Sequence, residues 1–358
     1  MLRSWRSVLG SGTMRGMLLG MLALPVCLLS QLPAVDLTED QTPAATAAVK
    51  KGLGWLAANQ RPDGSWAGTV GSSTGGVASC TLAFLSNGHV PGSGEYGQVV
   101  SRSLEFIMRS AQPTGLLFKN GMGPGGIMYH HGLATLCLAE AWGETADPKM
   151  RECLRKAVDL ICACQNQHGG WRYQPKISDD DLSATVMQLM ALRAAKDAGM
   201  DVPKEVIDAG IEYVKRCHNG RGQGKDGGFA YQPGGESGFA RAGAGVTSLQ
   251  VAGNYKATEV SEGVDYLMDF EPLGKKPHPK DGFYYYGMYY ATMGIYQAQS
   301  IGAWGRKAWQ AFYPATVAGM VKDQKPDGRW EGDYEVYPTA MAALILDIPC
   351  RYLPIYQR

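Results

Sequence analysis

The sequence predicts an all-α fold in which about twelve helices form a double ring. A Gln-x-x-x-Gly-x-Trp phrase occurs three times with the same internal spacing, as QRPDGSW at 60–66, QNQHGGW at 165–171 and QKPDGRW at 324–330. One-sided apolar stretches alternate along the chain with stretches that are apolar on most sides. Almost no segment favours a β-strand. Regular repetition of this kind indicates one structural unit used several times.

Incomplete copies of the phrase fill the gaps between the three full copies. DGGFAY at 226–231 and DGFYYY at 281–286 keep the glycine but carry Phe229 and Phe283 at the tryptophan position, and GPGGIMY at 123–129 keeps only the glycines. This position recurs every 44 to 61 residues. The chain therefore contains six units, each long enough for two helices and two loops.

Two sets of helices are expected, one before and one after each loop. The first set comprises 44–60, 96–111, 147–165, 203–218, 258–270 and 304–323. The second set comprises 75–88, 129–143, 181–198, 240–256, 286–302 and 337–347. Residues 148–165 carry an apolar stripe on one side, whereas 181–195 are apolar or small over most of the circumference. The second set is therefore expected to form the buried inner ring.

The repeated phrase has a structural interpretation in this arrangement. Its glycines permit a tight turn with positive φ. Its glutamine amide can donate to free carbonyls at the end of the outer helix. Its tryptophan can bury a large surface over the turn. We favour this role over a catalytic role.

Composition and charge exclude several classes of protein. Of the 358 residues, 45% are hydrophobic and 19% are charged, which is ordinary for a globular protein. The formal net charge is +1, so binding to a nucleic-acid backbone, which needs clustered positive charge, is not expected. The eight cysteines include no C-x-x-C pair and indicate neither a disulfide framework nor a zinc ribbon.

The N-terminal segment 1–34 has the features of an export signal. Three arginines precede an apolar stretch at 16–29 that is too short to span a membrane, and LPA at 32–34 is a weak cleavage site. We expect an exposed leader over 35–43 and one domain over 44–358, exported to the periplasm or the extracellular space. An uncleaved anchor is the alternative.

The repeated phrase resembles the repeats of squalene–hopene cyclases and of related α/α-toroid domains, which include the β subunits of protein prenyltransferases. The resemblance covers roughly residues 44–350 and rests on the three full copies and the degenerate copies at the expected period. The closing stretch at 337–358 is similar to the end of small exported cyclase-like proteins of unassigned activity. The resemblance implies an (α/α)6 toroid and an isoprenoid substrate or ligand.

The acid motif of the cyclases is not preserved. That family protonates its substrate with an Asp-x-Asp-Asp-Thr motif at the start of an inner helix, and the acid must be kept neutral by its neighbours. When Thr185 is aligned with the family threonine, the first aspartate falls on Asp181 and the other two positions hold Ser183 and Ala184. The resemblance leaves four candidate catalytic acids, which are Asp179, Asp180, Asp181 and Asp281. The alternative is structural, with Asp181 as the N-cap of the helix.

The zinc ligands of the protein prenyltransferases are also missing. That family uses an Asp-x-Cys pair and a later histidine in a Tyr-His-Thr segment. Asp281 is present, but Phe283 stands at the cysteine position and Pro338 at the histidine position. Phenylalanine and proline cannot ligate zinc. The sequence therefore predicts no zinc-dependent transferase and no cofactor.

Candidate binding residues gather where the inner helices begin. In a toroid all inner helices run in the same direction, so their positive N-terminal ends meet at one mouth. The candidate ligand-binding residues expected there are Tyr129, His130, His131, Arg241, Tyr284, Tyr285, Tyr289 and Tyr337. Adjacent histidines point to different faces of a helix, so at most one of this pair faces the centre. The structural alternatives are core histidines, packed tyrosines and an ion pair between Arg241 and Glu236.

Two functions from different classes are compatible with this mouth. The first is a cyclase-like protein that binds or cyclises an isoprenoid, with aromatic faces stabilising a cation. The second is a non-catalytic toroid that binds a glycan, a peptide or a protein partner. A deep apolar chamber with an inward-pointing aspartate would support the first, and a shallow channel filled by tyrosine and methionine would support the second. Neither function requires a transmembrane body, and both are compatible with peripheral contact with a membrane.

Overall fold

The computed structural model describes residues 42–119, 126–270 and 283–357. The predicted export signal at 1–34 and the candidate acid Asp281 lie outside these ranges. The described part of the chain is helical and has only isolated β-bridges in place of strands. This confirms the predicted all-α class.

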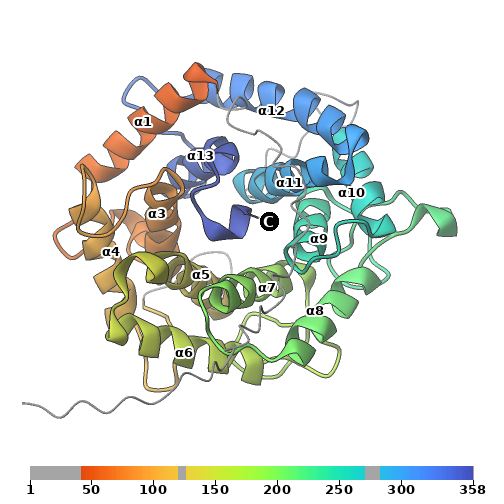
Figure 1. The fold of residues 1–358 in the computed structure, drawn as a ribbon, viewed down its shortest axis with the longest axis horizontal. Helices are drawn as coiled ribbons and strands as arrows, with labels where there is room; N and C mark the ends of the chain where they lie inside the picture. Colours follow the sequence, from red (N-terminus) through yellow and green to blue (C-terminus); the bar gives the residue numbers. More distant parts are fainter. Residues whose placement is uncertain (1–41, 120–125, 271–282, 358) are drawn as a thin grey trace, which may run out of the picture. The chain divides into compact units, whose positions relative to one another are not determined.

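Six helices form the outer ring (Figure 1). They are α1 (Pro43–Ala58), α4 (Gly97–Arg109), α6 (Pro148–Ala163), α8 (Lys204–Arg216), α10 (Thr258–Met268) and α12 (Ala303–Asp323). They bury one side only, as α6 shows, because its buried residues Met150, Leu154 and Ile161 recur at helical spacing. The rest of each helix surface faces solvent.

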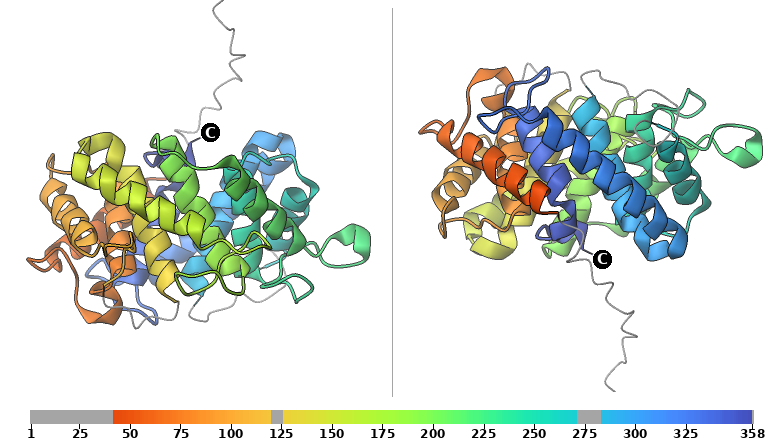
Figure 2. Two further views of the ribbon diagram at one scale, coloured as in Figure 1. Left: turned by 90° about the horizontal axis from the view of Figure 1, so that it is seen from below. Right: turned by 90° about the horizontal axis from the view of Figure 1, so that it is seen from above.

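Six further helices form the inner ring. They are α3 (Thr74–Ser86), α5 (Ile127–Thr145), α7 (Leu182–Asp197), α9 (Phe239–Val251), α11 (Tyr284–Ala298) and α13 (Tyr337–Asp347). Each inner helix contacts the next, and α13 contacts α3, so the ring is closed. Figure 2 shows from the side that helices of both layers run between the same two faces. The double ring is the predicted toroid, and a short helix, α2 (Gly68–Gly71), was not predicted.

The tryptophan of each full copy of the phrase ties the loop to the outer helix that precedes it. All three tryptophans are at most 1% exposed. Trp171 donates its indole N–H to the carbonyl of Ile161 in α6 over 2.8 Å, and the other two make the same bond ten residues back. The helix end therefore has one of its free carbonyls satisfied by the indole.

The glutamine of the phrase links neighbouring outer helices, which corrects the prediction that it serves its own helix. Gln165 donates to the carbonyls of Val206 in α8 and of Gly169 in its own loop, both over 2.9 Å. Gln324 does the same with Ala48 of α1 and so joins the last repeat to the first. The glutamine is free to reach outward because the indole N–H already occupies the carbonyl at the end of its own helix.

The glycine of the phrase packs against the backbone of the next outer helix. Gly169 has a φ of +85°, and a Cβ at this position would lie 2.1 Å from the carbonyl oxygen of Ala209 in α8. We expect Gly169→Ala to lower the free energy of unfolding by about 2–3 kcal/mol, because positive φ and steric overlap both act.

The matched control for Gly169→Ala is Gly199→Ala. Gly199 has a φ of +81° but nothing within 4 Å of its Cβ position. This variant is expected to lose only about 1 kcal/mol, the cost of the left-handed backbone alone. Urea denaturation measures both losses, and equal losses would show that the close approach to α8 contributes nothing.

The C-terminal segment closes the far end of the ring. Its last 3-10 helix, η4 (Pro354–Tyr356), lies inside the ring and contacts α7 (Figure 1). The backbone N–H of Ile355 donates to Glu140 of α5 over 3.2 Å, and the Tyr356 hydroxyl donates to the Tyr289 hydroxyl of α11 over 3.3 Å. The described part of the ring is therefore accessible from the end where the inner helices begin.

Candidate functional site

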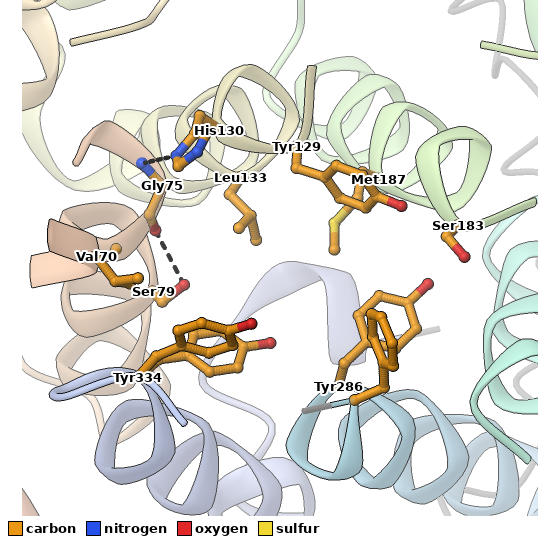
Figure 3. Close-up of a pocket in the computed structure, with 13 residues that line it drawn as sticks. Val70, Gly75, Ser79, Tyr129, His130, Leu133, Ser183, Met187, Tyr286 and Tyr334 are labelled. Carbon is orange, nitrogen blue, oxygen red and sulfur yellow. Dashed lines mark hydrogen bonds between the residues drawn. The ribbon is translucent and has the colours of Figure 1, made fainter. Parts of the chain in front are cut away.

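A cavity lies at the mouth of the ring, where the N-terminal ends of the inner helices meet (Figure 3). Its volume is about 130 Å³. We call it the chamber, and most of its wall is apolar or aromatic, including Tyr129, Leu133, Met187, Tyr286, Tyr334 and Tyr337. Side chains from α3, α5, α7, α11 and α13 meet around it, so that elements far apart in the sequence build one site.

A second cavity of about 450 Å³ adjoins the chamber at the mouth. The two share Tyr129, Ser183, Phe283 and Tyr286, and we call the second one the vestibule. The beginning of α9 contributes one wall of the vestibule, which includes Arg241. A molecule longer than the chamber can therefore extend from the chamber into the vestibule.

Arg241 supplies a positive charge to the vestibule. It lies in the first turn of α9 and is half-buried. Its guanidinium donates to the carbonyl of Ser237 over 3.1 Å. Among the described residues no carboxylate forms an ion pair with it, so the expected alternative of a pair with Glu236 is not observed there.

Below the chamber, tyrosine and methionine side chains fill the centre of the ring. A void of about 10 Å³ lies there among the described residues. The Tyr290 hydroxyl donates to Met187 Sδ over 3.2 Å, and the Tyr290 ring packs edge-to-face with Tyr286 and Tyr289 at 4.8 and 5.1 Å. Burial raises the pKa of these tyrosines, which keeps the phenols neutral. The interior is the shallow, filled channel that a binding toroid was expected to have.

The two adjacent histidines point to different sides of α5. His130 lines the chamber, where its Nδ1 accepts the N–H of Gly75 over 3.2 Å. His131 lies outside both cavities, where Nδ1 accepts the N–H of Leu117 and Nε2 lies 3.1 Å from the carbonyl of Ala157. Burial lowers the pKa of each imidazole to about 4, so both rings are neutral at neutral pH.

Asp181 is the N-cap of α7 and is fully buried. Its Oδ1 accepts the N–H of Ala184 over 2.8 Å, as the structural alternative predicted. Burial raises the pKa of Asp181 to about 6, although this hydrogen bond and Arg172, 3.8 Å away, act in the opposite direction. Thr185, the residue aligned with the family threonine, accepts the backbone N–H of Trp171. Thr185 therefore holds the repeat loop against α7, whereas the Asp181 side chain caps the start of that helix.

The other two candidate aspartates, Asp179 and Asp180, contact residues in or next to the same loop. Burial tends to raise the pKa of Asp180, but hydrogen bonds from Asn166 and His168, 2.7 and 3.0 Å long, outweigh burial and lower it. Asp179 is exposed and pairs with Arg172 over 3.2 Å. None of the three aspartates at 179–181 lines the chamber or the vestibule.

The predicted tyrosines are distributed over three cavities at the mouth and the filled centre below them. Tyr129 and Tyr337 line the chamber, Tyr284 lines the vestibule, and Tyr289 lies in the filled centre. Tyr285 lines a third cavity of about 440 Å³, together with Tyr284, Tyr337 and several charged residues of the loop before α13.

Several lining residues were not predicted, and two of them carry a signal in the sequence. Tyr173 and Tyr231 each stand two residues after the aromatic position of their repeat. Their hydroxyls are hydrogen-bonded to each other, and the Arg172 guanidinium lies over both rings at 4.8 and 5.6 Å. Ser183 and Met187, on the first turns of α7, have no such signal.

Residues 101–274 match the family described as the prenyltransferase alpha-alpha toroid domain. This match agrees with the α/α-toroid fold of the described residues. The comparison with curated proteins found no match. In the described part of this toroid, the seven cysteines are free, no group of three or more His, Cys, Asp or Glu side chains is placed to hold a metal ion, and no helix has the length and apolarity to cross a membrane.

Solved structures share the fold of this toroid. The apo type II terpene cyclase MstE from Scytonema has a TM-score of 0.55 at 13% identity, covering 87% of this chain and 100% of the cyclase. The GH76A alpha-1,6-mannanase from Salegentibacter sp. HEL1_6 has a TM-score of 0.64 at 7% identity, covering 86% and 99%. A protein from Actinoplanes has a TM-score of 0.54 at 12% identity, covering 86% and 99%. Identities this low establish the common fold alone.

Proposed function

We propose that this toroid binds an elongated amphiphilic small molecule of the isoprenoid type, without cyclising it. The apolar end of the ligand occupies the chamber and its polar end lies in the vestibule beside Arg241. The observation that carries the proposal is that an apolar chamber walled by tyrosines opens into a vestibule lined by the positively charged side chain of Arg241. Export of the domain, inferred from residues 1–34 alone, is part of the same proposal.

The chamber suits an uncharged group because the titratable side chains in its wall are uncharged at neutral pH. His130 has a lowered pKa, and Tyr129, Tyr286 and Tyr337 have raised ones, in each case chiefly because they are buried. Transfer of an apolar group into such a wall gains about 25 cal/mol per Å² of surface removed from water. A charged group would lose its hydration without a counter-charge. The polar end must therefore stay in the vestibule.

The aspartates argue against proton-initiated cyclisation by the described residues. A cyclase acid has to reach the double bond that it protonates. Asp181 has a raised pKa, but its Oδ1 caps α7 and its side chain lines neither the chamber nor the vestibule. Asp179 is paired with Arg172, and Asp180 is hydrogen-bonded to Asn166 and His168. The relationship to MstE supports the class of ligand more than the reaction, because that cyclase is described in complex with geranylgeranyl dihydroxybenzoate, an apolar chain with a polar head.

The test compares an isoprenoid alcohol with an isoprenoid acid. Geraniol and geranic acid differ only in the polar end, and isothermal titration calorimetry measures their affinities. We expect Arg241→Met to weaken the binding of geranic acid about 10-fold or more, since a charge-assisted hydrogen bond contributes about 1.5–3 kcal/mol. The same variant should change the affinity for geraniol less than threefold.

The matched control for Arg241→Met is Arg151→Met, because Arg151 is exposed on outer helix α6, away from the mouth. It should bind both ligands like the unmodified protein. Absence of saturable binding of either ligand to the unmodified protein would refute the proposed function. Equal weakening of both ligands by Arg241→Met would refute the placement of the polar end.

A glycan is the second candidate ligand. The third cavity, beside the chamber, combines Tyr284 and Tyr285 with Lys322, Asp323 and Glu331, a mixture of aromatic faces and polar groups. The mannanase from Salegentibacter is described in complex with alpha-1,6-mannotriose. Titration of the same protein with alpha-1,6-mannotriose distinguishes the candidates, because binding of the trisaccharide in preference to geraniol would favour the glycan.

A further inference from the structure

A partition of five side chains lies between the chamber and the enclosed void below it. The void of about 10 Å³ lies deeper in the ring, and the residues that line both spaces are Ser79, Leu133, Met187, Tyr286 and Tyr337. Met187 projects from α7 into the chamber wall (Figure 3). Its sulfur accepts the hydroxyl of Tyr290 over 3.2 Å, which fixes the thioether across the centre of the ring.

The size of the chamber limits what the apolar end can be. An apolar cavity of about 150 Å³ in a protein holds one benzene-sized molecule. At about 130 Å³ the chamber accommodates a group of that size, a single isoprene unit or one six-membered ring. A long chain folded into several rings has no space here, because tyrosine and methionine side chains occupy the centre of the ring.

Truncating Met187 would open the partition where its thioether lies against Tyr290, a residue that lines only the void. Met187→Ala removes three heavy atoms from the partition and leaves the backbone of α7 in place. The deeper space is walled by Leu136, Met341 and Leu344 together with the tyrosines, so it would accept further apolar atoms. Each additional buried methylene strengthens binding about fourfold, the equivalent of about 0.8 kcal/mol.

We propose that Met187 sets the length of the apolar end that this toroid accepts, and that this end is one isoprene unit or one six-membered ring. The inference rests on the proposed function, since it concerns the ligand of the same chamber. It goes further by naming the class of apolar group and the residue that selects it. Met187 acts by blocking the path and takes part in no reaction.

The experiment uses straight-chain carboxylates that differ by one methylene, titrated by calorimetry below their micelle concentrations. In the unmodified protein the affinity should rise about fourfold per methylene and then stop rising at one length. In Met187→Ala the rise should continue for about two further methylenes before it stops. Met190→Ala is the control, because Met190 is buried in the same helix and lines neither space, and it should keep the original break.

The outcomes separate the two proposals. The same break point in Met187→Ala and in the unmodified protein, or a rise without any break, would overturn the role of Met187 while leaving the proposed function standing. Failure of the whole series to bind the unmodified protein would overturn both. If Met187→Ala does not fold, Met187→Val removes less volume, and the break should then move by about one methylene.

Discussion

Replacing Trp330 by alanine should lower the free energy of unfolding by about 3–5 kcal/mol, the usual loss for a large aromatic side chain removed from a core. Trp330 is 1% exposed, and its indole donates to the carbonyl of Met320 in α12 over 2.7 Å. Its ring also packs so closely on α1 that a Cβ on Gly52 would lie 2.8 Å from it. Trp330 therefore lies between the last outer helix and the first.

The control is a tryptophan on the surface of the same helix. Trp304 is 37% exposed at the start of α12 and donates to Asp265 over 3.2 Å. Trp304→Ala should cost less than about 1.5 kcal/mol, because this ring is partly in contact with water in the folded state, so less burial is lost than at Trp330, and its hydrogen bond is exposed. Urea denaturation followed by circular dichroism gives both values. Similar losses in the two variants would contradict the closing role assigned to the repeated phrase.

The architecture could be predicted from the sequence because the same residues end each outer helix and join it to the next. Wherever an outer helix ends, a tryptophan fills the gap and a glycine lets the next helix approach, so the same residues recur at Trp66, Trp171 and Trp330. The choice of partner for Gln165 was wrong. A glutamine can reach either helix, and the sequence does not show that the indole has already taken the nearer carbonyl.

The residues at the mouth could be predicted from the sequence, but the residues that face the centre of the ring below it could not. Tyr129, His130 and Arg241 follow repeat turns, and parallel inner helices bring those positions together. Met187 and Tyr290 lie on helices that are apolar on nearly all sides, so their sequence pattern does not mark which residues face the centre of the ring. The contact between Ile355 and Glu140 joins residues 215 apart and belongs to no repeat.

The stability of this toroid should fall as the pH rises from about 7 to about 9, and Glu140→Gln should remove much of that fall. Burial is the main reason that the pKa of Glu140 is raised from its ordinary 4.5 to about 8, although a hydrogen bond from Ile355 acts in the opposite direction. The folded state therefore holds a proton that the unfolded chain has already released above pH 4.5. Between the two pKa values stability declines with rising pH.

Each unit of difference between the folded and unfolded pKa of Glu140 corresponds to about 1.4 kcal/mol in the free energy of unfolding. Because the protein relaxes around the charged carboxylate, we expect a total effect of about 3 kcal/mol. Glutamine keeps an acceptor for the N–H of Ile355 but carries no charge. Glu140→Gln should therefore match the unmodified protein at pH 5 and exceed its stability by about 3 kcal/mol at pH 9. Glu144→Gln is the control, because Glu144 is exposed on the same helix, and it should follow the unmodified protein at both values.

His130 and His131 do not affect the change in stability between pH 7 and 9, because they titrate below that range. His130 and His131 have lowered pKa values of about 4, so their stabilising effect is lost as the pH falls below about 6. Asp181, at about 6, acts in the same direction as Glu140 but only below about pH 7. A loss of stability between pH 7 and 9 that Glu140→Gln leaves unchanged would show that the carboxyl beneath the C-terminal segment is not buried as described. The segment closing the far end of the ring would then have to be held by other contacts.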